Sequence, residues 1–328
     1  MIRQIALGLV AAALMAVSGP AKADDFKPAI IFDMGGKFDK SFNEAAYNGI
    51  EKFKKETGID YMDFEVTQVS QREQAAKKMA QRKADIVVAM GFAQADAVEK
   101  AAKANPNTKF TIIDMVVDLP NVQSIVFREE QGSFLVGIAA AMASKTGKVG
   151  FVGGMDIPLI RKFALGYKEG VKYADPKAEV IENMTGTTPS AWNDPSKGGE
   201  LAKSQFDRGA DIVFAAAGGT GIGVYQTAAD SKKLAIGVDS NQDYLHPGVM
   251  LTSMLKRVDV AVYKTLMDAK NGTWKPGIQV LGLKEDGVGF AVDQWNKDVL
   301  TPDMIAAMNK AKADIIAGKI KVTDYMSK

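Results

Sequence analysis

The stretch Asp33-Met-Gly-Gly-Lys-Phe-Asp-Lys-Ser-Phe-Asn43 follows directly after the apolar run Ala29–Phe32. An apolar run that ends at an acid, passes two glycines and enters a helical pattern at Ser41 predicts a strand, a βα loop and the start of a helix. Ligands of open α/β sheets bind at corners of this kind. The stretch carries two carboxylates, two aromatic rings, an amide and a hydroxyl. This mixture indicates one half of a small-molecule pocket.

The composition is that of a globular protein. The chain has 328 residues, of which 47% are hydrophobic and 24% charged. This is enough for two ordinary domains, and it excludes a disordered or collagen-like chain. Cysteine is absent, so thiol catalysis and cysteine metal sites are excluded, and we expect no lipid-modified N-terminal cysteine. A chain of this size can bury a stable core without disulfides.

Residues 1–23 predict a cleavable secretory signal peptide. Arg3 precedes an apolar stretch over residues 5–17, and Ala21-Lys22-Ala23 has the small-x-small pattern of a cleavage site. The apolar part is short for a membrane span, although a retained N-terminal anchor is the alternative. Removing Arg3 and Lys22 lowers the basic residues from 41 to 39, equal to the 39 acidic ones. No polybasic patch then points to nucleic acid or to an anionic membrane, and the expected location is the periplasm.

The two halves of the chain repeat one strand-helix pattern. Ala84-Asp-Ile-Val recurs as Ala210-Asp-Ile-Val at a separation of 126 residues, and a strand ending at Asp114 recurs as one ending at Asp239 at a separation of 125 residues. Chance recurrence of buried-strand sequences could explain one such match, but it explains two matches at nearly the same offset less well. Strands that alternate with helices predict parallel sheets. We therefore expect two Rossmann-like α/β domains with a ligand cleft between them.

The predicted chain crosses between the domains about three times, near Phe127, Ser253 and Gly277. The expected division is an N-terminal domain of residues 24–127 plus 254–277 and a C-terminal domain of residues 128–253 plus 278–328. The absence of a Pro/Ser-rich linker at these points favours strand-like crossings that form a hinge.

Enzymatic alternatives have limited support in the sequence. Gly218-Gly-Thr-Gly-Ile-Gly223 follows a strand as a dinucleotide site would, but Val224 breaks the Gly-x-Gly-x-x-Gly spacing. No Walker lysine motif is present, and His246 is the single histidine, which excludes histidine triads and multi-histidine metal sites. No metal or cofactor is expected. A nicotinamide-dependent oxidoreductase, or a nucleoside hydrolase using Asp33 and Asp239, stays as the alternative to a binding protein.

Two aromatic residues in loops favour a planar ligand. Phe42 lies in the first βα corner and Trp192 in a polar loop. The alternatives are that Phe42 is the first buried position of its helix and that Trp192 packs against its own loop. If one ring faces the cleft from each domain, a heteroaromatic ligand can stack between them, at ~1 to 3 kcal/mol per base.

Charged residues at strand ends would orient such a ligand. Asp33, Asp114 and Asp239 each end a predicted strand, where carboxylates can accept hydrogen bonds from sugar hydroxyls or base amino groups. Lys256 can neutralise one of them and donate to a hydroxyl. Each aspartate alone could equally cap a helix or turn, so the prediction rests on the three together.

Motifs in the same order resemble the basic membrane protein family, which comprises substrate-binding proteins of ABC transporters. The resemblance covers nearly the whole chain after the signal peptide, and its motifs are Asp39-Lys-Ser-Phe-Asn43, Ile113-Asp114, Gly132-Ser-Phe-Leu-Val-Gly137, Trp192-Asn-Asp-Pro195, Ile236-Gly-Val-Asp239 and Leu251-Thr-Ser-Met-Leu-Lys-Arg257.

The resemblance implies a type I periplasmic-binding fold that closes on a purine nucleoside and delivers it to a permease in the inner membrane. It also implies that the protein is a monomer without catalytic activity or cofactor. The ligand-binding residues implied are Asp33, Phe42, Asn43, Asp114, Trp192, Gly219, Asp239 and Lys256. In this scheme Phe42 and Trp192 stack on the base. Asp114 reads the base edge beside Asp33 and Asn43, Gly219 lines the pocket, and Asp239 with Lys256 holds the ribose hydroxyls.

The chain departs from the family pattern at three points. It has no cysteine at the lipid-attachment position, Trp192 replaces a usual phenylalanine, and Asn241 replaces a frequent acid. The larger indole ring can change the ligand, and relatives bind other heteroaromatics. A free purine base or a flavin is therefore the alternative ligand.

Overall fold

A computed structural model describes residues 26–327, and within this range the strands form two six-stranded sheets of the same order. The first sheet has the order β11-β5-β4-β3-β1-β2 and contains β1 (Pro28–Phe32), β2 (Met62–Glu65), β3 (Ile86–Ala89), β4 (Lys109–Ile113), β5 (Val122–Phe127) and β11 (Gly277–Leu281). The second has the order β12-β10-β9-β8-β6-β7 and contains β6 (Lys148–Met155), β7 (Glu179–Gly186), β8 (Ile212–Ala216), β9 (Leu234–Asp239), β10 (Met250–Lys256) and β12 (Val288–Phe290). All pairs are parallel except β10 with β12. The predicted signal peptide lies outside the described residues.

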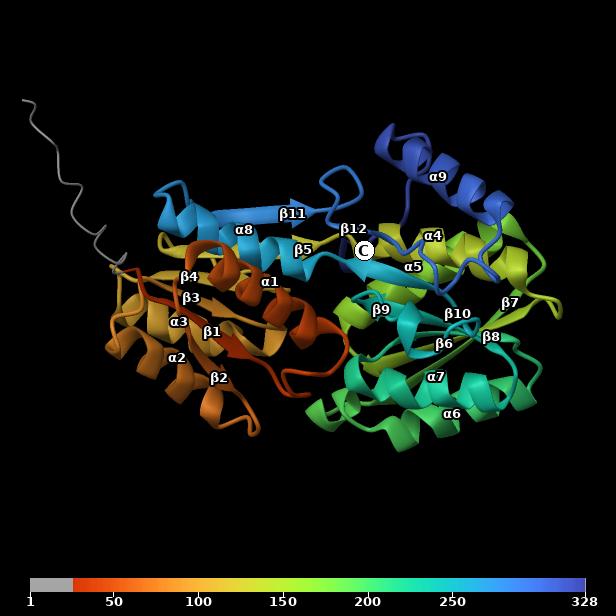
Figure 1. The fold of residues 1–328 in the computed structure, drawn as a ribbon, viewed down its shortest axis with the longest axis horizontal. Coiled ribbons are helices and arrows are strands. Elements are labelled where there is room, and N and C mark those ends of the chain that lie inside the picture. The colour runs from red at the N-terminus through yellow and green to blue at the C-terminus, as the bar shows by residue number, and fades with distance from the viewer. Residues whose placement is uncertain (1–25, 328) are drawn as a thin grey trace, which may run out of the picture.

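The helices cover both faces of each sheet (Figure 1). Around the first sheet lie α1 (Phe42–Thr57), α2 (Gln71–Gln81), α3 (Ala95–Ala104) and α8 (Val258–Lys270). Around the second lie α4 (Glu129–Ala143), α5 (Pro158–Ala174), α6 (Pro195–Asp207), α7 (Gly221–Asp230) and α9 (Pro302–Ile316). None of the helices in residues 26–327 has the length and apolar character that crossing a membrane requires.

The sequence repeat corresponds to equivalent strands. The two Ala-Asp-Ile-Val segments lead into β3 and β8, which occupy the same place in the two sheets. The strands that precede Asp114 and end at Asp239, β4 and β9, also match in position. Fully buried apolar residues make up β3 and β8, as expected for parallel strands covered on both faces.

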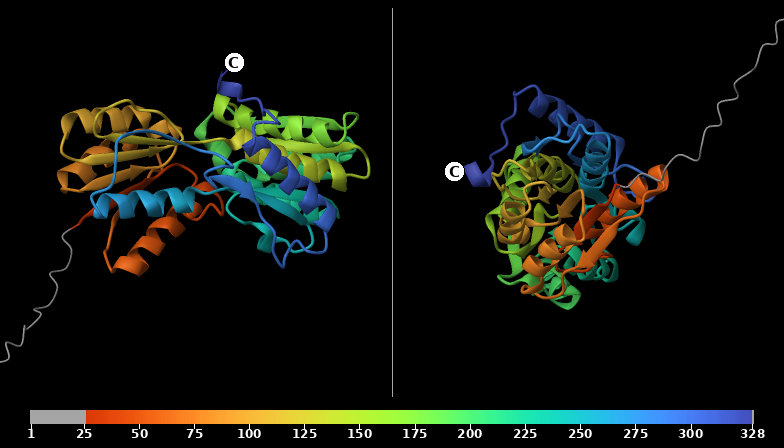
Figure 2. Two further views of the ribbon diagram at one scale, coloured as in Figure 1. Left: turned by 90° about the horizontal axis from the view of Figure 1, so that it is seen from above. Right: turned by 90° about the vertical axis from the view of Figure 1, so that its left-hand side faces the viewer.

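The chain crosses between the sheets after β5, after β10 and after β11. Figure 2 shows the two halves side by side, joined by these segments. The second and third crossings differ from the predicted boundaries. Residues 254–256 continue β10 in the second sheet, and residues 278–281 pair with β5 in the first. The predicted third crossing at Gly277 was wrong because this glycine, with φ 104°, begins an edge strand rather than a connection.

Candidate ligand-binding site

The candidate site is a pocket between the two sheets, at the carboxyl ends of their strands. The space between the lining atoms is about 620 Å³, a figure that includes the opening to solvent. The first half of the chain contributes the loops after β1, β3 and β4. The second half contributes helix α5, the loop after β7, the ends of β8, β9 and β10, and the turn that follows β8. This is the position predicted from the strand ends.

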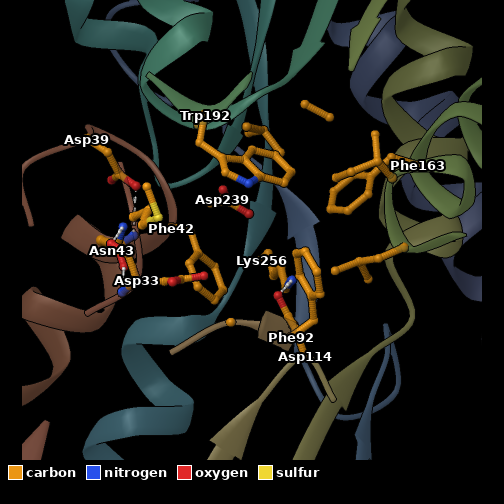
Figure 3. A pocket seen from close by; sticks show the side chains of 17 residues that line it. Asp33, Asp39, Phe42, Asn43, Phe92, Asp114, Phe163, Trp192, Asp239 and Lys256 are labelled. Carbon is orange, nitrogen blue, oxygen red and sulfur yellow. Dashed lines mark hydrogen bonds and ion pairs between the residues drawn. The ribbon is translucent and has the colours of Figure 1, made fainter. Parts of the chain in front are cut away.

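Four aromatic side chains surround the pocket. Phe42 at the start of α1 and Phe92 in a 3-10 turn (Phe92–Gln94) come from the first half of the chain, and Phe163 in α5 and Trp192 come from the second. Figure 3 shows the four rings around one central space. The sequence analysis missed Phe92 and Phe163. Phe92 had a usable signal, because it follows Gly91 directly at the end of a buried strand.

Trp192 lies over a glycine of the neighbouring strand. A Cβ atom built on Gly154 would come within 2.2 Å of the indole Cζ3, so only glycine leaves room for the ring there. Thr220 fixes the loop of Trp192, because its Oγ1 donates to the Ala191 carbonyl at 2.8 Å and accepts from the Asp194 amide at 2.8 Å. Trp192 therefore lines the pocket instead of packing only against its own loop.

Asp33 is held by two partners, one of which the sequence analysis did not identify. The Asn43 side chain accepts from the Asp33 amide at 3.2 Å and donates to the Asp33 carbonyl at 3.3 Å. Arg72 in α2 donates to the Asp33 carboxylate through Nε at 3.2 Å and through a terminal nitrogen at 3.0 Å. Burial raises the pKa of Asp33, and the Arg72 charge opposes that rise.

Asp39 caps the first helix from inside the pocket. Its carboxylate accepts from the backbone amides of Ser41, Asn43 and Glu44 at 2.8, 3.0 and 3.1 Å, which otherwise lack partners at a helix N-terminus. Burial raises the pKa of Asp39 to about 7, against these hydrogen bonds. The Asp39-Lys-Ser-Phe-Asn43 motif thus fixes where Phe42 and Asn43 point.

Lys256 is a buried cation at the base of the pocket. Its Nζ lies 2.7 Å from Asp114 Oδ2 and 3.0 Å from Glu129 Oε1. Burial alone would lower the pKa of Lys256, but the carboxylates of Asp114, Glu129 and Asp239 outweigh burial and raise it. Asp114 Oδ1 is buried and has no hydrogen-bond partner in the described structure. Asp114 lines the pocket, and a buried acceptor without a partner is a feature that a bound ligand can explain.

Asp239 joins the two domains beside the pocket. Its carboxylate accepts from the Ser41 hydroxyl, and the next residue, Ser240, donates from Oγ to the Ser41 carbonyl at 2.9 Å. Gln242 adds a hydrogen bond from Nε2 to the Lys40 carbonyl at 2.9 Å. The loop after β9 therefore contacts the loop after β1 directly. Of the three acids at the strand ends, Asp114 is the one that forms an ion pair with Lys256 in the described structure.

A family model described as ABC transporter substrate-binding protein PnrA-like, Bmp, matches residues 26–324. The chain belongs to the Bmp family. It is 34% identical over 328 residues to the "ABC transporter nucleoside-binding protein BmpA" of Lactococcus lactis, covering 93% of this chain and 91% of the relative. It is 37% identical over 319 residues to the "Uncharacterized lipoprotein PH1714" of Pyrococcus horikoshii, covering 89% of this chain and 76% of that one.

The structural comparison agrees with the family. A solute-binding protein of an ABC transporter system from Aeropyrum pernix superposes with a TM-score of 0.84 at 28% identity, covering 92% of this chain and 96% of that one. The fold of this Bmp protein is therefore the type I periplasmic-binding fold, with two α/β domains and a hinge. The protein is a substrate-binding protein of an ABC transporter that works outside the cytoplasm.

The pocket of this Bmp protein contains all the predicted ligand-binding residues except Gly219. Gly218 lines the pocket in its place, and a Cβ on Gly219 would meet the Trp192 carbonyl at 3.3 Å. Asn241 also lies outside the lining, where its Nδ2 donates to Asp293 at 2.6 Å. Within residues 26–327, no cluster of three or more His, Cys, Asp and Glu could hold a metal ion.

Proposed function

We propose that this protein binds a purine nucleoside in the pocket between its domains and presents it to the permease of an ABC transporter. The observation that carries the proposal is the pocket itself: aromatic rings from both domains face a space whose polar side chains include four carboxylates, the Asn43 amide and the Lys256 ammonium. Stacking binds the base, and carboxylates accept its N–H groups and the ribose hydroxyls. The name of the Lactococcus lactis relative supports a nucleoside.

The proposed orientation puts the base between Phe42 and Trp192. Asp114 Oδ1 then accepts from the base edge, since among the described residues that line the pocket it is the carboxylate oxygen that is buried without a hydrogen-bond partner. Asp239 and Lys256 contact the ribose. Asp33 and Asn43 lie beside the base, where Arg72 and the paired hydrogen bonds fix them. A free purine base or a flavin would use the same rings, but it would leave the ribose contacts unpaired or crowd them.

A receptor role is proposed in preference to catalysis. The single histidine, His246, lies in the turn between β9 and β10 and is not part of the pocket lining. The Asp33 carboxylate accepts hydrogen bonds from Arg72, and one oxygen of the Asp239 carboxylate accepts from Ser41. This arrangement favours binding over proton transfer, so the ligand is expected to be released unchanged.

We further propose that the protein is a periplasmic monomer without a lipid anchor. The support for export without an anchor is the predicted cleavage after Ala23 and the absence of cysteine from the sequence, whereas the monomeric state is proposed from the family resemblance alone. The Pyrococcus horikoshii relative is called a lipoprotein, so anchoring is a point on which this chain is proposed to differ. Membrane fractionation of the native host would test it, because an anchored protein would sediment with the membranes.

A thermal-shift screen tests the ligand assignment. Residues 24–328 are mixed separately with adenosine, guanosine, inosine, free purines, riboflavin, ribose and NAD, since a ligand that binds the native state raises the melting temperature. The expected result is a large shift with purine nucleosides and none with ribose or NAD. A shift with riboflavin or free bases alone would contradict the nucleoside assignment. A shift with NAD alone would contradict the receptor reading, and chromatography of the recovered ligand would detect turnover.

A further inference from the structure

Glu129 places one carboxylate between two lysines. Its Oε1 lies 3.0 Å from Lys256 Nζ and its Oε2 lies 2.8 Å from Lys162 Nζ. The Glu129 side chain is 1% exposed, and those of Lys256 and Lys162 are 2% and 7% exposed. Together with Asp114, these groups form a buried chain of alternating charge that runs from the pocket into the molecule.

The chain determines where the Lys256 ammonium points. A lysine stem is flexible, so partners on several sides must fix it. Asp114 and Glu129 contact Nζ, and the ring centroids of Phe127, Phe42 and Phe163 lie 5.0, 5.2 and 5.8 Å from it. A lysine ammonium has three N–H donors. One of them is donated to Asp114 Oδ2, and Glu129 acts on the ammonium as a charge, without a hydrogen bond.

Glu129 is itself anchored at the first crossing between the domains. It is the first residue of α4, where the helix dipole favours a negative charge. Lys162 holds it from α5 and also donates to the carbonyl of Phe127, the last residue of β5, at 2.7 Å. Burial would raise the pKa of Glu129, but the two ammonium groups hold it below its ordinary value. The carboxylate is therefore a fixed negative charge.

We propose that Glu129, held by Lys162, is the positioning residue for Lys256 in nucleoside binding, and that it leaves Asp114 free to accept from the ligand by sharing the ammonium charge. This inference rests on the proposed function for its consequence in binding. The geometry behind it, one ammonium group between two carboxylates, is present in the protein without a ligand.

The charged groups facing Asp114 come from three elements: Lys256 in β10, Glu129 in α4 and Asp239 in β9. Burial raises the pKa of Asp114 to about 6, Lys256 opposes the rise, and the negative charge of Glu129 adds to it. When Glu129 carries no charge, Asp114 is the remaining ion-pair partner of the Lys256 ammonium. The pKa of Asp114 should then fall, and the pair should close on itself away from the ligand.

The test compares Glu129→Gln with Glu130→Gln. Glu130 is an equally buried neighbour that lies 3.5 Å from Lys162 and has no ion pair with Lys256. Affinities for adenosine, guanosine and inosine are measured by calorimetry between about pH 8 and about pH 5. E129Q should bind nucleosides at least about tenfold more weakly near neutral pH, because the Lys256 ammonium is no longer held in place to donate to the ligand. The pH at which affinity is lost on acidification should also be lower in E129Q than in the parent. E130Q should show neither change.

A second readout needs no ligand. The carboxyl ¹³C signal of Asp114, assigned with Asp114→Asn, is followed over the same pH range in the free protein. In E129Q its midpoint should fall, whereas in E130Q it should stay. An unmoved midpoint together with parental affinity would overturn the inference. If the parent binds no nucleoside but the midpoint moves, the positioning relation is supported and the proposed ligand is wrong. Should E129Q fail to fold, E129Q/K162M removes one charge of each sign and tests the same relation.

Discussion

Asp114 and Asp239 stand at equivalent places in the two sheets, and both have positive φ angles, 71° and 64°. Such angles are uncommon outside glycine, although aspartate is among the residues that tolerate them. The turn takes each carboxylate off its strand direction and into one shared pocket. Backbone strain of this kind persists where surrounding structure enforces it, often at binding sites. The sequence repeat thus places a pair of matched acids in the lining of one pocket.

The first prediction concerns Asp239 and the ribose. Asp239→Gly removes the carboxylate while keeping a residue that accepts φ 64°. A site that binds a hydroxyl rejects the analogue lacking it, because its own polar groups are then unpaired. The parent should therefore prefer ribonucleosides over 2′- or 3′-deoxynucleosides, whereas D239G should bind them nearly equally, with ribonucleoside affinity reduced roughly ten- to a hundredfold. Calorimetry with both ligand series measures this.

Ser41→Ala is the matched control, because it removes the hydroxyl that donates to Asp239 across the domains and leaves the carboxylate. S41A should weaken both ligand series by a similar factor and keep the preference for ribose. A D239G protein that still rejects deoxynucleosides as the parent does would show that the ribose assignment is wrong.

The second prediction concerns the glycine beneath Trp192. Gly154→Ala places a methyl group at 2.2 Å from the indole Cζ3, so the ring must move out of its position. Affinity should fall by the stacking contribution, ~1 to 3 kcal/mol, while the overall fold persists. Gly186→Ala on the adjacent strand is the control, since its Cβ would meet only the Ala191 Cβ at 3.7 Å. Equal affinities of G154A and G186A would contradict this role of Trp192.

The sequence predicted the pocket well where the fold itself brings residues together. Asp33, Asp114 and Asp239 follow apolar runs, and the carboxyl ends of parallel strands share one edge of a sheet. Two residues that contact the charged groups of the pocket lie in helices, and no local sequence pattern marks them as part of the site. Arg72 reads as one charge on a polar helix, and Glu129 as one acid at a helix start. Their burial arises only from packing.

The predicted element boundaries were wrong where two local sequence signals competed. Gly277 reads as a turn, but β11 begins there and adds an edge strand to the first sheet. Its alternating side chains Ile278 and Val280 are exposed, so no buried pattern marks the strand. Phe163 is apolar on a helix and reads as core, which it is on one side, while its ring also faces the ligand space.

The third prediction concerns the Arg72–Asp33 ion pair, whose side chains are both 11% exposed. Arg72→Met leaves the Asp33 carboxylate buried without its cation. Removing one partner of a buried pair costs about 3–5 kcal/mol, so the free energy of unfolding at neutral pH should fall by at least about 2 kcal/mol after allowing for protonation of Asp33. Urea unfolding measures the change.

Arg82→Met is the control for that change, since Arg82 is exposed at the end of the same helix, and it should alter stability by less than about 0.5 kcal/mol. Asp33→Asn combined with R72M should recover part of the loss by removing the buried charge. If R72M and R82M unfold alike, the pair contributes nothing to stability and serves only to orient Asp33.

The fourth prediction concerns stability against pH. Burial raises the pKa of Asp39, Glu130 and Asp243 to about 7 each, above the ordinary values that they regain on unfolding, roughly 4. Between those values the folded protein binds more protons than the unfolded chain. Stability therefore rises as pH falls from about 8 to about 6, by an amount of the order of 1 kcal/mol or more, and the gain is lost again as pH rises through about 7.

Urea unfolding at about pH 8, pH 7 and pH 6 measures this slope, and Glu130→Gln should reduce it because it removes one of the groups with a pKa near 7. Nucleoside affinity should change in the opposite direction, since protonation of Asp114 near pH 6 removes the acceptor for the base. The two trends separate a binding effect from a folding effect. If the parent protein instead loses stability as the pH falls from 8 to 6, the pKa values of these three carboxyl groups are not raised in the folded state.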